Sequence, residues 1–126
     1  HIFIPMGAKY DYEQGKNFAH IIAELVHAKL PKLTSLERSP KDRRKQIYLD
    51  YLQNRTGQTL AAAYSVRPRP GATVSTPLEW KEIKSGLHPS QFTIKNILKR
   101  IEEKGDRFKG VLGKGVDMNE CLEKLG

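Results

Sequence analysis

Apolar residues recur with helical spacing in one long segment near the start of the chain. Asp11 and Gln14 just before it have the spacing of a capping box, and Pro31 is expected to stop the helix. The pattern therefore predicts an amphipathic helix from about residue 12 to about residue 30. Its apolar positions, spaced i, i+3, i+4, i+7 and i+8, are Phe18, Ile21, Ile22, Leu25 and Val26.

Three shorter runs read as strands. Residues 2–6 form an apolar run that ends near Pro5 and Gly7. Residues 46–52 and 59–66 are rich in β-branched and aromatic or apolar side chains, and the segment from Asn54 to Gly57 suits a tight connection between them. We therefore expect these two runs to form an antiparallel pair. The following run Arg67-Pro68-Arg69-Pro70-Gly71 is expected to leave the sheet as a stiff, extended segment.

Helix-start signals recur in the second half. Thr76, Pro77 and Glu79 have the order of a helix N-terminus, and Trp80 is expected to anchor that short helix. Further helices are expected from about Thr93 to Gly105, and from Asp117 onward. The sequence thus predicts the α/β (α+β) class, with a small, mostly antiparallel sheet packed by helices. It further predicts a domain over residues 1–109 and a glycine-containing tail over residues 110–126, with a flexible hinge at residues 113–115.

The composition of the chain indicates which class of molecule it binds. The chain has 126 residues, with 22 Lys and Arg against 14 Asp and Glu, hence a net charge of +8 and a pI near 9.7. Such a balance favours a polyanion, nucleic acid before a membrane surface. No apolar stretch approaches the roughly 20 residues of a membrane span. The single Cys121 excludes an internal disulfide and favours an intracellular protein. Because the chain starts at His1 in an apolar run, we expect it to be a piece of a larger domain.

Asp50 is the foremost candidate for chemistry. Its neighbours in the run 46–52 are mostly apolar, where a carboxylate must be paired, hydrogen-bonded or metal-bound unless it turns outward at the end of the strand. Basic residues flank it on both sides in the sequence, as a site for a metal-bound polyphosphate would require. Two alternatives stay open: the first basic group is a solvated loop, and the Arg-Pro-Arg-Pro run is a disordered basic linker. The flanking residues are Lys41, Arg43, Arg44, Lys45, Arg55, Arg67 and Arg69.

Several of these segments closely resemble the polymerase domain of bacterial ATP-dependent DNA ligase D, which belongs to the archaeo-eukaryotic primase superfamily. The resemblance covers nearly all of residues 1–109. His1 and Pro5 are similar to the end of that family's Ser-Gly-Gly-x-Gly-x-His-x-x-x-Pro motif, and residues 91–94 match its Asp-Phe-Thr-Ile segment except at Gln91. The other segments that carry the resemblance are Ile47-Tyr48-Leu49-Asp50-Tyr51-Leu52-Gln53-Asn54, Thr59 to Gly71, and Val74-Ser75-Thr76-Pro77-Leu78-Glu79-Trp80.

The resemblance implies the C-terminal part of a primase-polymerase fold and a role in non-homologous end joining. The intact domain would add nucleotides, often ribonucleotides, at DNA ends by a two-metal mechanism with manganese or magnesium and a nucleoside triphosphate. DNA ends, the Ku protein and fused ligase or nuclease domains would be its partners, with no membrane involved. The expected location is the bacterial cytoplasm at the nucleoid.

The resemblance also implies functional roles for individual residues. Asp50 would be a catalytic metal ligand, the third carboxylate of the site. His1, Arg43, Gln53 and Arg67 would bind the nucleotide, with Arg67 at its triphosphate. The basic residues expected to bind DNA phosphates are Arg44, Lys45, Arg55 and Arg69.

One departure from the family pattern matters for activity. Nothing here replaces the family's Asp-x-Asp, because Asp11 and Glu13 lie at a helix start, and one carboxylate cannot hold two metal ions. We therefore expect this chain alone to be inactive. The alternative function is a non-catalytic, basic module that binds DNA ends. A general RNA-binding domain would fit the charge but not Asp50 among arginines.

Overall fold

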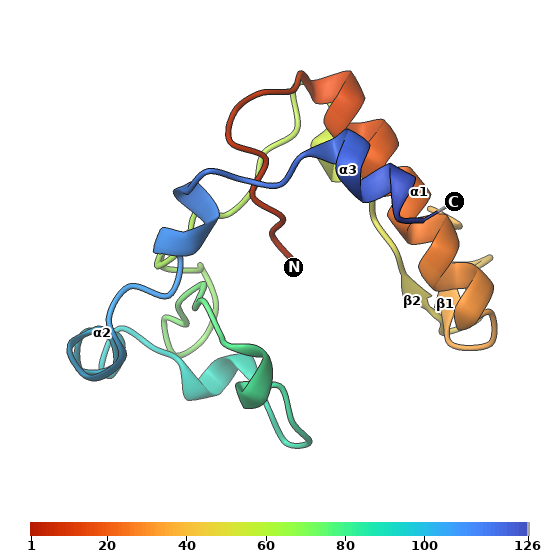
Figure 1. Cartoon of the computed structure of the whole chain (residues 1–126). Coiled ribbons are helices and arrows are strands. Elements are labelled where there is room, and N and C mark those ends of the chain that lie inside the picture. Colours follow the sequence, from red (N-terminus) through yellow and green to blue (C-terminus); the bar gives the residue numbers. More distant parts are fainter. Residues whose placement is uncertain (126) are drawn as a thin grey trace. The chain divides into compact units, whose positions relative to one another are not determined.

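The computed structural model describes residues 1–125, which divide into two compact units. We call residues 8–60 with 117–125 the helical unit, and residues 1–7 with 61–116 the hairpin unit. The helices and strands are α1 (Tyr12–Lys29), β1 (Thr34–Ser35), β2 (Ile47–Tyr48), α2 (Ile97–Lys104) and α3 (Met118–Glu123) (Figure 1). Short 3₁₀ helices are η1 (Leu52–Asn54), η2 (Trp80–Glu82), η3 (Pro89–Gln91) and η4 (Lys109–Leu112).

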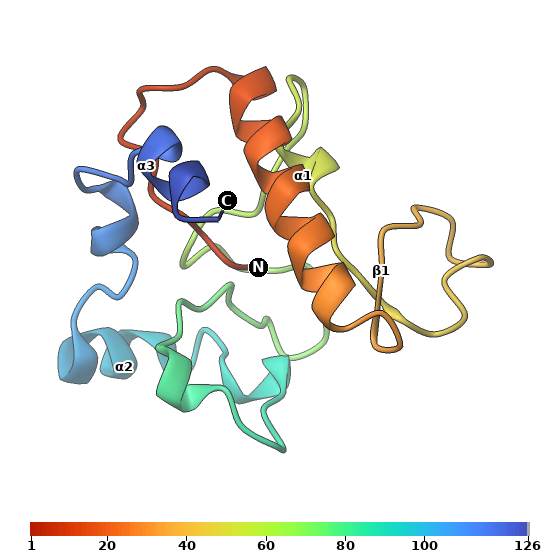
Figure 2. The ribbon, with the colours of Figure 1, turned by 45° about the vertical axis from the view of Figure 1, so that its right-hand side comes forward.

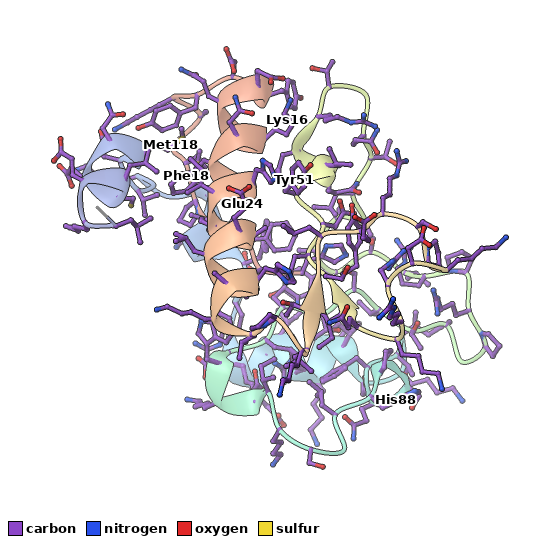
Figure 3. All side chains as sticks on the ribbon, turned by 90° about the vertical axis from the view of Figure 1, so that its right-hand side faces the viewer. Lys16, Phe18, Glu24, Tyr51, His88 and Met118 are labelled. Atoms are coloured by element: carbon purple, nitrogen blue, oxygen red, sulfur yellow. The ribbon has the colours of Figure 1, made fainter. Side chains whose placement is uncertain are left out.

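Helix α1 confirms the capping prediction. Asp11 Oδ1 accepts a hydrogen bond from the Gln14 amide at 2.8 Å, and Gln14 Oε1 accepts one from the Asp11 amide at 3.0 Å. The helix ends at Lys29, two residues before Pro31, as expected. Phe18 of α1 and Met118 of α3 are both buried and lie on the facing sides of these two helices (Figure 3).

The sheet of the helical unit differs from the expected pairing. Ile47–Tyr48 pairs in parallel with Thr34–Ser35, not with residues 59–66. Residues 36–46 form the crossover loop between the two strands (Figure 2). The expected strand stops early because the next residues turn onto α1. There Tyr51 stacks on His20 with ring centroids 4.0 Å apart, and residues 52–54 become η1.

Antiparallel pairing occurs instead in the hairpin unit. Val66 and Val74 form one antiparallel bridge, and Thr73 and Thr93 form another. Arg67 N donates to Thr73 O at 2.7 Å, so the run from Arg67 to Gly71 reverses the chain instead of extending away from it. The expectation of an extended exit was wrong: Gly71 adopts φ +84°, a left-handed conformation that glycine allows and that closes the turn.

The helix signals of the second half are partly confirmed. Asp117 caps α3 by accepting from the amides of residues 119 and 120, and Gly105 ends α2 with φ +70°. The start expected at Thr76 is wrong, because the Thr76 hydroxyl donates to Val74 O and Glu79 caps η2 instead. Trp80 does not anchor this short helix, because the residue is 74% exposed.

The tail and the N-terminal run contact each other within the hairpin unit. Residues 2–6 form no strand, and Ile2 is 72% exposed. Val116 N donates to Pro5 O at 2.8 Å, and a Cβ placed on Gly115 would overlap backbone atoms of Met6 and Gly7. Gly115 is therefore tightly packed, where the sequence suggested a flexible hinge.

The mixture of helices with small paired segments confirms the α/β class. None of the helices is long and apolar enough to cross a membrane in the described part of the chain. Buried apolar residues are few there: Phe18, Ala23, Val74, Ile97 and Met118.

Candidate nucleotide and DNA site

Asp50 lies two residues after Tyr48, the last residue of β2, and its side chain is exposed. The strand therefore turns the carboxylate outward, which avoids the large desolvation cost that an interior position would impose. Burial raises the pKa of the Tyr48 phenol, and the nearby negative charge of Asp50 raises it further. Asp50 and Tyr48 are thus electrostatically coupled neighbours.

Arg43 joins this pair from the crossover loop. Its guanidinium carbon lies 4.6 Å from the centroid of the Tyr48 ring, within cation–π range. One terminal nitrogen donates to Arg38 O at 2.8 Å, while Nε is buried and has no hydrogen-bond partner among residues 1–125. We call Arg43, Tyr48 and Asp50 the Asp50 cluster. It combines a cation that packs on an aromatic ring with a carboxylate near the same residue.

The other predicted residues of the helical unit surround this cluster in sequence. Gln53 Nε2 donates to Thr59 O at 2.6 Å and so closes the loop that carries the exposed Arg55. Arg44 and Lys45 are exposed and adopt positive φ angles of 46° and 67°, a conformation that costs free energy in residues other than glycine. The strained backbone directs two cations into solvent beside Arg43.

His1, Arg67 and Arg69 belong to the hairpin unit. Arg67 and Arg69 lie on the turn between Val66 and Val74, with Arg67 half-buried and Arg69 exposed. His1 is exposed, with its ring centroid 6.4 Å from that of Phe3. The antiparallel pairing expected between residues 46–52, which include Asp50, and residues 59–66, which precede Arg67, does not form.

The carboxylates do not fit a two-metal centre by themselves. Two metal ions a few ångströms apart need several acidic ligands. Within residues 1–125, no group of three or more His, Cys, Asp or Glu side chains is placed to hold a metal ion. Asp50 can contribute one ligand, and the chain as described completes no metal site around it.

Sequence reasoning missed a second charged cluster, in the hairpin unit. Both carboxylate oxygens of Glu82 bind Arg100, at 2.9 and 2.7 Å, and Lys104 Nζ lies 2.5 Å from Oε1. The bidentate Arg100 holds the pKa of the Glu82 carboxyl well below its usual range, against the opposing effect of burial. The i, i+4 spacing of the two cations on a helix was the available signal.

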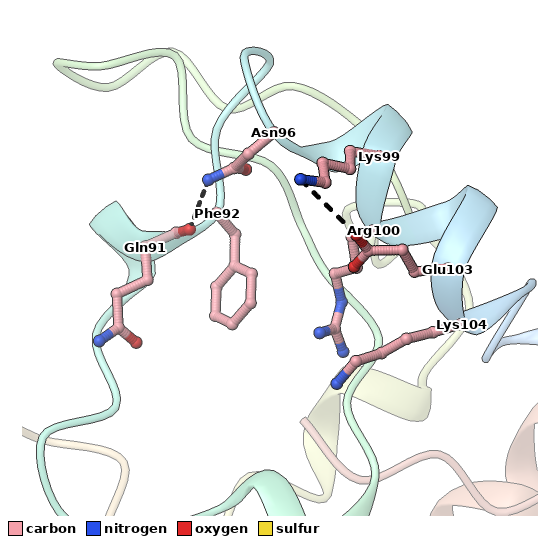
Figure 4. Close-up of a pocket in the computed structure, with 7 residues that line it drawn as sticks. All are labelled: Gln91, Phe92, Asn96, Lys99, Arg100, Glu103 and Lys104. Carbon is pink, nitrogen blue, oxygen red and sulfur yellow. Dashed lines mark hydrogen bonds and ion pairs between the residues drawn. The ribbon is translucent and has the colours of Figure 1, made fainter.

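A shallow pocket lies beside this charged cluster (Figure 4). Arg100 lies 5.3 Å from the Phe92 ring centroid. Asn96 donates to Gln91 O at 2.9 Å, and Lys99 pairs with Glu103 at 3.8 Å. The contact of Arg100 with the Phe92 ring joins α2 to the 91–96 segment, and the polar bonds at the pocket stay within that segment or within α2.

Tyr48 was also missed, although its signal is simple. Side chains two residues apart in an extended segment lie on the same face, so a residue two before a candidate carboxylate is its natural neighbour. The ring at position 48 contacts the Arg43 guanidinium, and the pKa of its phenol is raised by the charge of Asp50.

Comparison with known proteins gives one consistent result. Residues 1–108 match the family described as LigD, primase-polymerase domain. The chain is 38% identical over 108 residues to the bifunctional non-homologous end joining protein LigD of Bacillus subtilis, covering 85% of this chain and 18% of that protein. It is 31% identical over 103 residues to the multifunctional LigD of Pseudomonas aeruginosa, covering 82% of this chain and 12% of that protein.

A solved structure with a similar fold supports this result. The polymerase domain of Mycobacterium tuberculosis ligase D, in complex with DNA, superposes with a TM-score of 0.76 at 21% sequence identity. The match covers 90% of this chain and 43% of that chain. The chain therefore spans less than half of the solved domain and less than a fifth of the two relatives above.

Proposed function

The chain belongs to the LigD primase-polymerase domain family, and on that premise we propose that it is part of a nucleotidyltransferase module of DNA repair. The module adds nucleotides, often ribonucleotides, at DNA ends during non-homologous end joining. The observation that carries this proposal is the family match over residues 1–108. The names of the B. subtilis and P. aeruginosa relatives, both non-homologous end joining proteins, support it.

Within this proposal, the Asp50 cluster faces the nucleotide. Arg43 and Arg67 supply guanidinium groups, which bind phosphate oxygens bidentately in a way that lysine cannot reproduce. Gln53 donates one N–H of its side-chain amide to Thr59 O, so its second N–H and its carbonyl oxygen remain to contact a nucleotide. His1 would lie beside the nucleotide, and the DNA phosphates would be bound by Arg44, Lys45, Arg55 and Arg69.

The chemistry itself needs more than this chain supplies. A bound divalent metal, manganese or magnesium, would polarise the α-phosphate of the incoming nucleoside triphosphate. Because the described residues do not fit a two-metal site, we assign no catalytic step to this chain alone. Asp50 acts only together with further carboxylates. Association with Ku, with fused ligase or nuclease modules, and with the bacterial nucleoid are further predictions of the same proposal.

A second candidate function is a non-catalytic module that grips DNA ends. The net charge of +8 favours contact with phosphates, and residues 1–125 hold no ready metal cluster. The two functions differ in one property: only the first requires the Asp50 carboxylate.

A chimera separates the two functions. Residues 1–108 replace the matched 108 residues of B. subtilis LigD, and extension of a DNA end is measured with Mn²⁺ or Mg²⁺ and nucleoside triphosphates. We expect the chimera to extend the end, and Asp50→Ala to abolish extension while DNA binding persists. A folded chimera that binds DNA but extends equally with and without Asp50 would favour the binding module.

The isolated chain gives a complementary result. We expect it to incorporate no nucleotide above an Asp50→Ala control with either metal, since one carboxylate cannot hold two ions. Incorporation that depends on Asp50 in the isolated chain would contradict this expectation.

A further inference from the structure

The segment around η1 carries two of the proposed ligand-binding residues, and we call residues 50–54 the η1 turn. Asp50 begins this turn and Gln53 lies inside it. Before the turn, the Leu49 amide is bonded to β1 at 2.9 Å. After it, Gln53 Nε2 donates to Thr59 O at 2.6 Å. A single 3₁₀ turn has poor hydrogen-bond geometry of its own, so the position of the η1 turn depends on tertiary contacts.

Tyr51 makes such a contact at the centre of the η1 turn. Its ring stacks on the ring of His20 in α1, with centroids 4.0 Å apart and planes inclined by 23°. Figure 3 shows Tyr51 beside that helix. Tyr51 O also accepts from the backbone amide of Asn54 at 3.3 Å and from its side-chain Nδ2 at 3.1 Å. One residue thus joins α1 to the backbone of the turn.

The imidazole of His20 is oriented for this stack by its own helix. Its Nε2 lies 3.6 Å from Glu24 Oε1, one turn further along α1. None of the hydrogen bonds or ion pairs of residues 1–125 joins α1 to the η1 turn, so the aromatic pair is the directional contact between them. Any influence of His20 on Asp50 or Gln53 therefore passes through Tyr51.

We propose that His20 is a positioning residue for nucleotide binding. By stacking on Tyr51, it fixes the η1 turn, and with it Asp50 and Gln53, in the orientation that a nucleoside triphosphate requires. His20 itself does not touch the nucleotide. The inference rests on the proposed function, because that function supplies the nucleotide as the ligand of the turn.

NMR of the 126-residue chain tests the positioning without any ligand. In His20→Ala, the Gln53 Nε2 proton bonded to Thr59 O should move toward the chemical shift of a solvated amide, because the turn loses its contact with α1. Gln46 is the internal control: its Nε2 donates to Pro31 O at 2.8 Å, so its signal should stay in place. An unchanged Gln53 signal in a folded His20→Ala chain overturns the proposal.

Nucleotide affinity in the B. subtilis chimera gives the functional readout. His20→Ala should raise both the Kd of a fluorescent nucleoside triphosphate and the KM for nucleotide in DNA-end extension at least about threefold, the change that matches the loss of an aromatic pair. His20→Phe keeps a ring for Tyr51 and should restore both values to within about twofold of the wild type. A merely structural role would reduce the amount of folded protein, and hence the apparent kcat, and would leave KM unchanged.

His27→Ala is the matched control for stability. His27 lies on the same helix, about two turns after His20, and its Nδ1 lies 3.1 Å from Thr34 Oγ1 of β1. This variant should lower the melting temperature of the chimera and leave the Kd and KM for nucleotide unchanged. An unchanged Kd in folded His20→Ala overturns the proposal, and so does a folded His20→Phe that binds as weakly as His20→Ala.

Failure of the proposed function is recognised separately. A chimera that shows the His20→Ala loss and the His20→Phe rescue in nucleotide binding, but extends no DNA end, keeps the positioning role and loses the activity. A chimera that extends DNA ends with the same KM in wild type and His20→Ala keeps the activity and overturns the positioning role. If the chimera binds no nucleotide, the proposed function fails, and the Gln53 signal alone decides whether His20 holds the turn.

Discussion

At the scale of single residues, the Asp50 carboxylate changes the pKa of Tyr48. Burial and then the Asp50 charge raise the pKa of Tyr48, so removing that charge makes the phenolate easier to form. We predict that Asp50→Ala lowers the pKa of Tyr48, measured by NMR titration of the ring carbon that bears the hydroxyl.

A matched control exists in the hairpin unit. Tyr64 donates to Asp106 Oδ1 at 2.9 Å, and burial and this hydrogen bond raise its pKa. Asp106→Ala should shift the Tyr64 titration and leave that of Tyr48 in place. An unchanged Tyr48 pKa in Asp50→Ala would show that the two side chains are not coupled.

Charge alone selects some single residues as candidates for the site, and their roles stay predictions. Asp50 was identified because a carboxylate lies among many cations in the sequence, and that argument needs no fold. The Gln53 bond to Thr59 O and the packing of Arg43 on the Tyr48 ring were not predictable. They depend on how a loop closes and on where a strand ends, which local patterns do not determine.

At the scale of elements, Glu82 connects η2 to α2. Its pKa is held below the usual range by Arg100 and Lys104, so the folded state binds the proton less readily than the unfolded chain. The stabilisation is therefore fully present above the unfolded carboxyl pKa of about 4.3, and is lost as pH falls below it toward the depressed folded pKa.

We predict that Glu82→Gln lowers the free energy of unfolding by about 1–3 kcal/mol at pH 7, and that the difference from the wild type shrinks below pH 4. Urea denaturation at several pH values measures this. Glu103→Gln is the control, because Glu103 makes only an exposed pair with Lys99 at 3.8 Å and such pairs contribute little. A Glu82→Gln deficit that persists unchanged at acid pH would contradict the role of the ion pairs.

A glycine contact joins the tail to the N-terminal run. Gly115 has φ +77°, and a Cβ there would overlap backbone atoms of Met6 and Gly7. Gly57 has a similar φ of +79° but open space around it, so Gly57→Ala carries the conformational strain alone, about 1 kcal/mol. We predict a clearly larger loss for Gly115→Ala, measured by urea denaturation, with faster amide exchange at Val116. Equal losses for the two substitutions would show that the close contact does not matter.

Elements were predictable where the signal is local. The capping box at Asp11 and the caps at Gly105 and Asp117 depend on residues within one turn, and all three are present. Strand pairing is not local. The residue pattern of 46–52 suits either partner, and the stacking of Tyr51 on His20 of α1 ends that strand early.

At the scale of the whole molecule, the positive charge is unevenly divided. The hairpin unit holds 11 Lys and Arg against 5 Asp and Glu, a net charge of +6, whereas the helical unit holds 11 against 9, a net charge of +2. The total of +8 is readable from composition, but its division requires the fold, because residues 1–7 join residues 61–116 in one unit. The larger net charge of the hairpin unit favours phosphate contacts there, at Arg69, in addition to the contacts proposed for Arg44, Lys45 and Arg55 of the helical unit.

Cations of the hairpin unit also differ in whether they are free to bind phosphate. Arg69 is exposed on the Val66 to Val74 turn and has no ion-pair partner in the described part of the chain, whereas Lys81 Nζ lies 2.7 Å from Glu79. A cation that binds a phosphate releases counterions, and each such contact adds about −0.9 to the slope of log K against log salt.

We predict that Arg69→Ala makes this slope shallower by about 0.9 for a DNA duplex end, measured by fluorescence anisotropy from low to moderate salt. Lys81→Ala should change the slope less than Arg69→Ala, because Lys81 is paired with Glu79, although Glu79 also pairs with Arg107. Equal slopes for wild type and Arg69→Ala would show that the turn between Val66 and Val74 makes no phosphate contact, and the excess charge would then be ordinary solvated surface.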